Sequence, residues 1–490
     1  MRHFFCALAL LSAGLAVSPH ETRAETPTPC SGVDVTRGSD IQALMDFHGE
    51  GATFCLEKGV HRITETLTPR SGQRLIGEPG AILNGSRLIP NNSVRKSGRF
   101  WVVPNVTPLG RFAAPDGVGP CRPYAQQKNA PGSCIYPDQV FIGNRPMRQE
   151  LRLDAVKKRE FFLDRAERKI YLPGNPEGRK IEVSVTREAI AGYTSDVTVS
   201  GLVIEKFANA LQTGAIASGD SWIIEHNEVR LNNGIGIFSG AGNLLFDNYV
   251  HHNGQLGLAG QGAGIVVDSN EISYNNTNGV NWAWEGGGAK WVRTTELVVK
   301  NNHTHHNQGP GMWTDGYNVD TLYDGNRIED NLVQGLIHEI SYDAIIRNNV
   351  VRRNGFGHEA KHAYWGGGIE VWQSPNVEIY GNVVKYNAHG IMAMMTPRGS
   401  GPQGVLEVRN LFVHNNEITL SNPNGRSGLA VYGDSGNEYF NVKNNRFEDN
   451  TYWLADHHAG SHFTWKKQYI SPKQWRDFGN DRTGRFRENG

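Results

Sequence analysis

Short apolar runs separated by Asn and Gly recur along most of the chain. The phrase Asn-x-Val/Ile, or a close variant, returns with an uninterrupted spacing of roughly 21 to 24 residues, at Asn227, Asn248, Asn270, Asn302, Asn326, Asn349, Asn382, Asn416 and Asn445. A second Asn, then Gly and an apolar residue, follows most of these phrases, as in "NNGIGI", "NQGPGM" and "NLVQGL". Short runs between turn residues predict strands, and a repeat of this period predicts a solenoid.

The Asn residues favour one kind of solenoid. Asn tolerates left-handed backbone and can stack its amide on the Asn of the next coil, which suits the corners of a parallel β-helix. The Leu framework and helical half of leucine-rich repeats are missing, and a propeller needs about 40 to 50 residues per blade. We therefore predict an all-β, right-handed parallel β-helix in which the amides of Asn326 and Asn349 stack. Over about residues 195–450 the repeat resembles that of carbohydrate-active β-helix proteins of the pectate-lyase-like class.

The flanks of the repeat predict the remaining parts of the chain. "SDIQALMDF" at 39–47 has the spacing of a short amphipathic helix that would cap the core, and "SPKQWRDF" at 471–478 predicts a closing helix. Between Asn91 and about Val185 the repeat is lost, which predicts a small β insert. This insert is read first as a packing subdomain, with carbohydrate binding as the alternative. The expected divisions are 25–90 for the cap and first coils, 91–185 for the insert, 186–455 for the β-helix core and 456–490 for the C-terminal cap.

The N-terminus predicts export. Residues 1–24 have an early Arg2, an apolar run and small residues ending at Ala24, which is the layout of a signal peptide cleaved near that residue. No later apolar run is long enough to span a bilayer, so we expect no membrane anchor. The mature chain would be secreted or periplasmic, where disulfides persist. Its four cysteines allow three pairings, of which short loops favour Cys30–Cys55 and Cys121–Cys134.

Composition narrows the partners. A hydrophobic content of 38% supports a buried core, and 49 Lys+Arg balance 49 Asp+Glu. The absence of net charge gives no reason to expect nucleic acid or an anionic membrane as the main partner.

Alternation along three predicted strands places carboxylates on one outer face. If Met312, Leu336 and Ile369 point into the core, every second residue from them points outward. The outward positions include three acidic and three aromatic residues: Asp315, Glu339, Glu370, Trp313, Tyr317 and Trp372. His338 points inward and is expected to be a core residue.

Strand geometry assigns these carboxylates different roles. Adjacent coils lie about 4.8 Å apart, so Asp315 stacks directly on Glu339, while Glu370 lies diagonally about 8 Å from Glu339. Carboxyl groups about 6.5 to 9.5 Å apart suit an inverting glycosidase, and about 5 to 5.5 Å suits a retaining one. We expect Glu339 to be the general acid, because a neighbouring carboxylate disfavours its ionisation, and Glu370 to be the base that activates water. Exposed Trp313 and Trp372 would bind the sugar rings.

Insertions in the repeat point to the same face. The repeat is stretched at 282–294, 355–368 and 396–404, more than turns require, and loops from nearby coils of a solenoid emerge on one side. Together they add the candidate substrate-binding residues Glu285, Lys290, His358, His362 and Arg398. The phrases "EGGGAK", "TTELVVKNN", "GPGMWTD" and "HEIS" resemble one group of bacterial β-helix repeat proteins, and this resemblance implies no catalytic assignment.

No metal site is predicted. "NHTHHN" at 302–307 has a counterpart, "VHHN", in an earlier coil, so its histidines are read as stacked turn residues. "HEAKH" lacks the H-E-x-x-H order of zinc proteases. No cofactor is expected, except a calcium ion if the protein is a lyase.

Three functions fit these residues, all with a polysaccharide or oligosaccharide as partner. The first is an inverting glycoside hydrolase that uses the paired carboxylates. The second is a polysaccharide lyase or uronate epimerase, with Lys290 or a His as base. The third is a non-catalytic glycan-binding surface protein.

Overall fold

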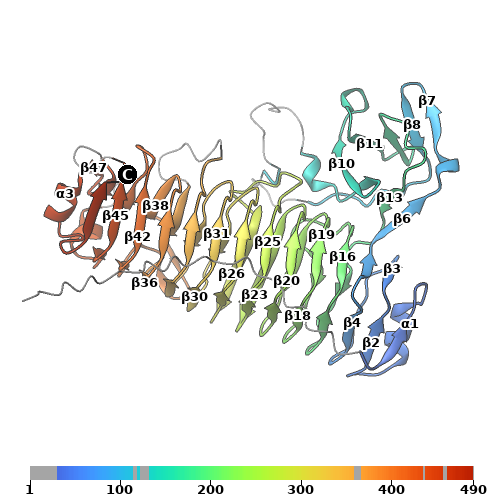
Figure 1. Ribbon diagram of the computed structural model, residues 1–490, viewed down its shortest axis with the longest axis horizontal. Coiled ribbons are helices and arrows are strands. Elements are labelled where there is room, and N and C mark those ends of the chain that lie inside the picture. Colours follow the sequence, from blue (N-terminus) through green and yellow to red (C-terminus); the bar gives the residue numbers. More distant parts are fainter. Residues whose placement is uncertain are drawn as a thin grey trace, which may run out of the picture.

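The computed structural model describes residues 30–113, 119–121, 132–357, 366–433, 436–455 and 461–488. The described chain forms a right-handed parallel β-helix, with the first coils at one end of an elongated body and the last coils at the other (Figure 1). The fold class predicted from the sequence is confirmed. The expected signal peptide lies outside the described residues, and the domain limits drawn from the sequence stay predictions.

Three parallel sheets form the solenoid, and from β14 (Ile190–Ala191) onward most coils contribute one strand to each sheet. The first sheet contains β1 (Val33–Val35), β2 (Thr53–Leu56), β4 (Arg74–Gly77), β15 (Thr198–Ser200), β18 (Ile223–Glu225), β21 (Leu244–Phe246), β24 (Val266–Asp268), β27 (Val298–Lys300), β30 (Thr321–Asp324), β33 (Ala344–Arg347), β36 (Val377–Tyr380), β41 (Phe412–His414) and β44 (Arg446–Glu448). The second contains β3 (Gly59–Arg62), β5 (Ala81–Asn84), β16 (Val203–Glu205), β19 (Glu228–Arg230), β22 (Tyr249–His251), β25 (Glu271–Ser273), β28 (His303–His305), β31 (Arg327–Glu329), β34 (Val350–Arg352), β37 (Val383–Lys385), β42 (Glu417–Leu420), β45 (Thr451–Leu454) and β48 (Arg485–Glu488).

The third sheet carries the candidate site. It contains β14 (Ile190–Ala191), β17 (Gly214–Ala217), β20 (Ile235–Ser239), β23 (Leu256–Ala263), β26 (Gly287–Thr295), β29 (Met312–Asp315), β32 (Leu336–Glu339), β35 (Gly367–Trp372), β38 (His389–Met395), β43 (Ser427–Val431), β46 (Phe463–Trp465) and, antiparallel at its edge, β47 (Gln468–Ile470). A small hairpin of β39 (Ser400–Gly401) and β40 (Gly404–Val405) follows β38.

Asn ladders hold the corners of the coils. The amide of Asn326 donates to Oδ1 of Asn349 over 2.9 Å, and the backbone N–H of Asn326 donates to the same oxygen over 2.9 Å. These bonds satisfy buried polar groups that a turn would otherwise leave unpaired. The predicted stacking is confirmed, and a second ladder runs through Asn232, Asn253, Asn275, Asn307, Asn331, Asn354 and Asn387.

The prediction that Asn445 continues the first Asn ladder is wrong. Asn416 donates to Oδ1 of Asn450 over 3.0 Å, so Asn450 continues the first ladder. Asn445 instead accepts from the backbone N–H of Leu411 over 3.0 Å, one corner earlier in its coil. A similar Asn phrase begins at Asn445 and again at Asn450. The spacing in the sequence does not show which of the two residues continues the first ladder.

Short helices lie at both ends. Helix α1 (Ile41–Phe47) is capped by the Asp40 side chain and buries Ile41 and Met45 in the main core. Helix α3 (Pro472–Asp477) begins with a capping box at Ser471, and the remaining helices are α2 (Glu438–Asn441), η1 (Asn91–Ser93), η2 (Ser133–Ile135) and η3 (Leu153–Ala155). Both end helices agree with the sequence prediction. Within the described chain, no helix is long and apolar enough to cross a lipid bilayer.

The β insert projects from the N-terminal part of the solenoid (Figure 1). Its sheet has the order β6 (Ser86–Ile89), β13 (Ile181–Ser184), β9 (Val140–Ile142), β10 (Arg145–Glu150), β11 (Glu160–Asp164), β12 (Lys169–Leu172), β8 (Phe100–Val103) and β7 (Arg95–Ser97). It has an apolar core of its own around Phe161 and Ile170.

Buried charges join the insert to the β-helix. Glu182 of β13 is fully buried and lies 2.7 Å from Arg62 of β3 and 2.7 Å from the buried Lys206. Lys206 also donates to the Asn144 side chain over 3.0 Å. Both predicted disulfides, Cys30–Cys55 and Cys121–Cys134, are present.

Candidate functional site

The candidate carboxylates lie on three neighbouring strands, β29, β32 and β35. The core positions Met312, Leu336 and Ile369 pair in register and are fully buried, as predicted. The register therefore sets two columns side by side on the other face of the sheet: Asp315, Glu339 and Trp372 in one, Trp313, Ile337 and Glu370 in the other.

Lys290, on the neighbouring strand β26, is the centre of a charged cluster on this face. Its ammonium lies 2.8 Å from Asp315, 3.1 Å from Glu285 and 3.6 Å above the ring of Trp313, and it donates to the Trp284 carbonyl over 2.7 Å. Burial alone would lower the pKa of Lys290, but the two carboxylates outweigh burial and raise it. Lys290 is thus a fixed cation and is unsuited to act as a base.

Glu339, unlike Lys290, is held in an environment that favours its uncharged form. Only 5% of Glu339 is exposed, and burial, followed by the negative charge of Asp315, raises its pKa to about 7. Lys290 and Arg398, whose guanidinium lies 3.6 Å from Glu339, act in the other direction without cancelling these effects. A carboxyl with this pKa is partly protonated near neutral pH and can donate a proton.

A cavity of about 450 Å³ lies over these strands. Its walls come from the loop before β26 and from the loop after β38, which lie far apart in the sequence. The cavity brings together many of the predicted site residues, namely Glu285, Lys290, Trp313, Asp315, Glu339, Trp372 and Arg398. The expectation that insertions gather over one face of the solenoid agrees with these two loops; the third lies largely outside the described residues.

Glu370 does not line this cavity. It is fully buried, and its carboxylate accepts from the backbone N–H of Gly367 over 2.5 Å and from the Gln334 amide over 3.2 Å. Its side chain lies against Gly367, where a β-carbon would meet the Glu370 Cγ at 2.6 Å. Burial raises the pKa of Glu370 to about 8. The expectation that Glu370 activates water stays a prediction, which its burial and its place outside the cavity lining do not favour.

The two predicted stacking platforms are also buried. Trp313 and Trp372 are each only 6% exposed. The Lys290 ammonium covers one face of Trp313, and Trp372 packs against Met392 and Met394. Both Trp residues form walls of the cavity, but neither offers the open ring expected from strand alternation.

Other predicted site residues lie elsewhere. Tyr317 does not line the cavity; its ring lies against Gly401, in the loop that carries Arg398. His358 and His362 fall outside the described residues. His338 is fully buried between Thr314 Oγ1 at 2.8 Å and the Tyr342 carbonyl at 3.0 Å, and burial lowers its pKa to about 4. His338 is thus a neutral core residue.

Sequence reasoning missed three residues of the cavity, Trp282, Trp284 and Gln334. Trp284 is half-buried, so it retains more open ring surface than Trp313. The phrase W-A-W at the start of a glycine-rich insertion was available as a signal, whereas nothing in the sequence distinguishes Gln334. In the described residues, no group of three or more His, Cys, Asp or Glu side chains is arranged to hold a metal ion.

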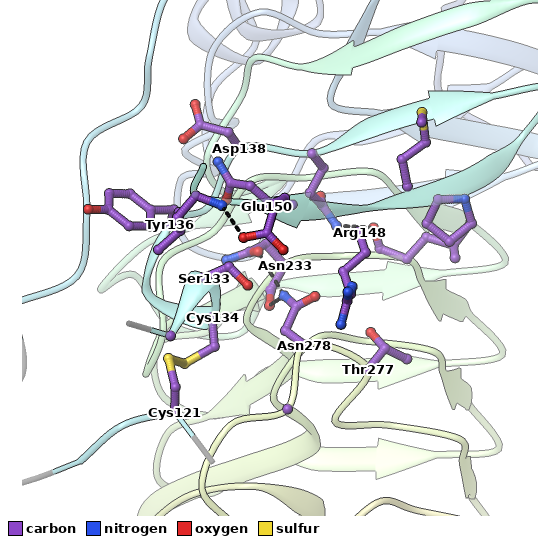
Figure 2. Close-up of a pocket in the computed structure, with 18 of the residues that line it drawn as sticks. Cys121, Ser133, Cys134, Tyr136, Asp138, Arg148, Glu150, Asn233, Thr277 and Asn278 are labelled. Atoms are coloured by element: carbon purple, nitrogen blue, oxygen red, sulfur yellow. Dashed lines mark hydrogen bonds between the residues drawn. A yellow bond between two sulfur atoms is a disulfide. The ribbon is translucent and has the colours of Figure 1, made fainter. Parts of the chain in front are cut away.

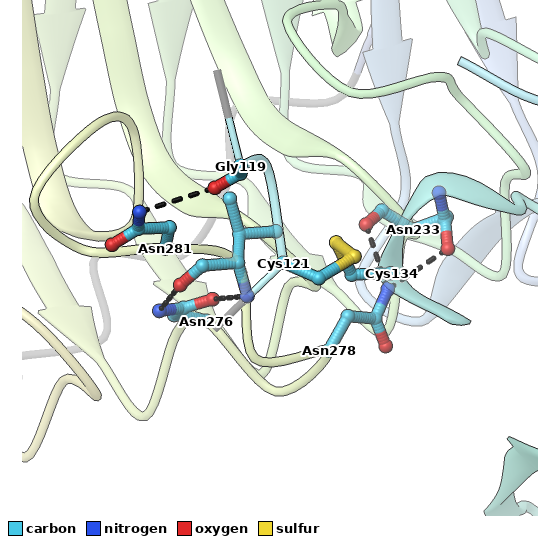
Figure 3. The surroundings of a disulfide bond; sticks show 8 residues. Gly119, Cys121, Cys134, Asn233, Asn276, Asn278 and Asn281 are labelled. Carbon is cyan, nitrogen blue, oxygen red and sulfur yellow. Dashed lines mark hydrogen bonds between the residues drawn. A yellow bond between two sulfur atoms is a disulfide. The ribbon is translucent and has the colours of Figure 1, made fainter. Parts of the chain in front are cut away.

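The loop that supplies Trp284 and Glu285 rests on the insert. Cys121 forms an antiparallel bridge with Val280, and the N–H of Asn281 donates to the Pro120 carbonyl over 2.8 Å. The Asn281 amide donates to the Gly119 carbonyl over 3.1 Å (Figure 3). The Cys121–Cys134 disulfide holds this short segment in place, so it supports one wall of the cavity.

Residues 213–398 match the family model described as right handed beta helix region. The protein has the right-handed β-helix fold. No curated protein matches the chain at a significant level. A solved structure titled as the complex of XylC with xylose shares 14% identity, covers 88% of this chain and 83% of that chain, and has a TM-score of 0.63. The A-module of the Azotobacter vinelandii mannuronan C-5 epimerase AlgE4 shares 14% identity over 86% of this chain and 94% of that chain, with a TM-score of 0.49. The likeness to XylC shows the fold and no more.

The support from the insert leads to a prediction for the disulfide. Removing it in Cys121→Ser/Cys134→Ser should free the Trp284 loop, and misplacing residues near the chemistry can lower kcat/KM by up to about 10²-fold. Tryptophan fluorescence should change even without substrate, because Trp282 and Trp284 lie on that loop.

The matched control is Cys30→Ser/Cys55→Ser, which removes the disulfide near the N-terminal cap. Both double variants should lose stability, and only the first should change kcat/KM and fluorescence. Equal effects in the two variants would show that the disulfide has a general structural role.

Proposed function

We propose that the protein is an exported glycoside hydrolase that cleaves a polysaccharide or oligosaccharide. The observation that carries the proposal is Glu339, a carboxyl with a pKa of about 7 beside a second carboxylate, Asp315, in a Trp-lined cavity. An acid that keeps its proton near neutral pH and a neighbouring ionised carboxylate form the machinery of glycoside hydrolysis. A protein of the same fold has been seen with xylose bound, which is consistent with a sugar ligand.

The two carboxyl groups that line the cavity favour a retaining mechanism. Asp315 and Glu339 pair in register on adjacent strands, which lie about 4.8 Å apart, close to the separation of about 5 to 5.5 Å that suits a nucleophile and an acid/base. The inverting assignment needed Glu370, which does not line the cavity. Lys290 lies 2.8 Å from Asp315 and holds that side chain in place through an ion pair.

The reaction then divides between two residues. Glu339 protonates the glycosidic oxygen while Asp315 attacks the anomeric carbon, which breaks the bond to the leaving sugar and forms a glycosyl ester. Glu339, now ionised, takes a proton from water, and the resulting attack releases the sugar and restores Asp315. Trp284 and Arg398 are positioned to contact the sugar.

The lyase alternative has less support. A lyase or epimerase needs a base, and the sequence offered Lys290 or a His for this role; among the described residues, no His lines the cavity. The two carboxylates at Lys290 raise its pKa, so it stays charged at neutral pH. The third alternative, a non-catalytic glycan-binding protein, is distinguished from the hydrolase by a screen for cleavage of polysaccharides.

The test is a screen of the purified protein on diverse polysaccharides. New reducing ends without ultraviolet absorbance from an unsaturated product would support hydrolysis, whereas that absorbance would identify a lyase. Proton NMR of the first product should then show retained anomeric configuration. Inverted configuration would overturn the role of Asp315 as nucleophile, and binding without cleavage would favour a glycan-binding protein.

A further inference from the structure

A second cavity of about 280 Å³ lies between the insert and the β-helix. Strands β9 and β10 and the short helix η2 of the insert form one side, and corner turns of the β-helix, including Thr277–Gly279, form the other (Figure 2). It shares no lining residue with the cavity around Glu339.

Hydrogen-bond acceptors converge in this cavity. One oxygen of Glu150 accepts from the backbone N–H of Leu151 over 2.8 Å, and within the described part of the chain no basic side chain forms an ion pair with Glu150. Figure 2 shows the Glu150 carboxylate directed toward the side chains of Ser133 and Asn278.

The donors nearby are largely used. The amide of Asn278 donates to Asn233 Oδ1 over 2.8 Å, which leaves its own oxygen as an acceptor. Arg148 pairs with Glu160, and Arg165 pairs with the other carboxylate of the lining, Asp138, over 2.9 Å. The acceptors that remain are the second oxygen of Glu150 and Oδ1 of Asn278, and they favour a ligand that brings several donors.

Size and lining together define the ligand. The volume is at the low end of small-molecule sites, which span about 300 to 1,000 Å³, and it suits one or two sugar rings. Phe141, Met147 and Leu151 add apolar surface for the C–H faces of a ring. Hydroxyl groups supply the donors, and the unpaired Glu150 disfavours an acidic sugar.

We propose that this cavity is a second saccharide-binding site, selective for neutral or amino sugars over uronates. The site binds a sugar without cleaving it and does not depend on the chemistry at Glu339. Thr277–Gly279 belong to the loop that continues to Trp284, so both sites are built on one segment of the β-helix.

The experiment is saturation-transfer NMR on the full chain with xylose, xylobiose, glucose, cellobiose, mannose, glucosamine and glucuronate. At least one neutral or amino sugar should bind, and Glu150→Ala should weaken that binding by about 10- to 100-fold, as expected for lost hydrogen bonds to a charged group. Asn278→Ala is a second variant, which removes the other acceptor of the lining, and circular dichroism checks the folding of each. Glu167→Ala, which removes an exposed carboxylate of the same insert, should leave binding unchanged.

Arg398→Ala separates this proposal from the proposed function, because Arg398 lines the cavity around Glu339 and lies on a loop that does not line the second cavity. Binding that survives Arg398→Ala and is weakened by Glu150→Ala supports the second site. Binding that is weakened by Arg398→Ala and unaffected by Glu150→Ala overturns the second site and leaves the hydrolase proposal standing. Absence of binding by every sugar tested, or a preference for glucuronate, also overturns it.

Discussion

Glu339→Gln is expected to lower turnover by about 10² to 10⁴, the usual effect of removing a general acid. The amide keeps the shape of the side chain but has no proton to give to the leaving group. The measurement is kcat on the substrate found in the screen, after circular dichroism has shown that the variant folds. A substrate with a leaving group that needs no protonation should recover much of the lost bond-cleavage rate, because only the acid step is removed.

The pH profile tests the same residue in the unmodified protein. Because the pKa of Glu339 is raised to about 7, the protonated acid is abundant below that pH, and kcat/KM should fall as pH rises through it. Arg398 favours the ionised form of Glu339, so Arg398→Gln should raise the pKa and move the alkaline limb to higher pH. An unmoved limb would assign it to another group.

Glu370→Gln is the matched control for Glu339→Gln. Both changes replace a buried carboxyl by an amide of the same shape on neighbouring strands, but Glu370 is held by Gly367 and Gln334 away from the cavity. Glu370→Gln should therefore retain most of the turnover. A large loss in Glu370→Gln with near-normal turnover in Glu339→Gln would reverse the assignment.

The fold was predictable because its information is local and repeated. Each coil carries its own Asn and Gly turn residues, and period-two alternation fixes which side chains enter the core, so the register of Asp315 on Glu339 followed directly. Short sequence separations likewise favoured the disulfide pairs that the structure contains.

The exposure of the site was not predictable in the same way. Strand alternation states on which face a side chain lies, but the loops that cover that face decide whether water reaches it. Lys290 was assigned to a loop and in fact lies in β26, where it covers Trp313. Glu370 lies on the predicted face, yet it folds back onto Gly367. The contact of Lys290 with Trp313 and the hydrogen bond from Gln334 to Glu370 each join neighbouring coils, and no single repeat encodes them.

Glu182→Gln is expected to have the largest effect on stability. Glu182 is fully buried among Arg62, Lys206 and Lys180, and although burial opposes ionisation, these cations lower its pKa from 4.5 to about 2. A shift of this size corresponds to about 3 kcal/mol of folding free energy at neutral pH, in line with the cost of about 3 to 5 kcal/mol for breaking a buried ion pair. Denaturant unfolding at pH 7 should show this loss.

The pH dependence of folding stability shows whether the effect of Glu182→Gln comes from charge. A carboxyl whose pKa is lower in the folded state stabilises the protein above its unfolded pKa of 4.5 and loses that contribution as pH falls toward its folded pKa of about 2. The difference in unfolding free energy between the unmodified protein and Glu182→Gln should therefore shrink over this acid range.

Glu167→Gln, at an exposed position of the same insert, should have little effect at any pH. Adding Lys206→Met should recover part of the loss, because it removes a buried ammonium whose shorter ion pair, at 2.7 Å, is lost in Glu182→Gln. A loss in Glu182→Gln that is the same at every pH would mean that packing, and not charge, joins the insert to the β-helix.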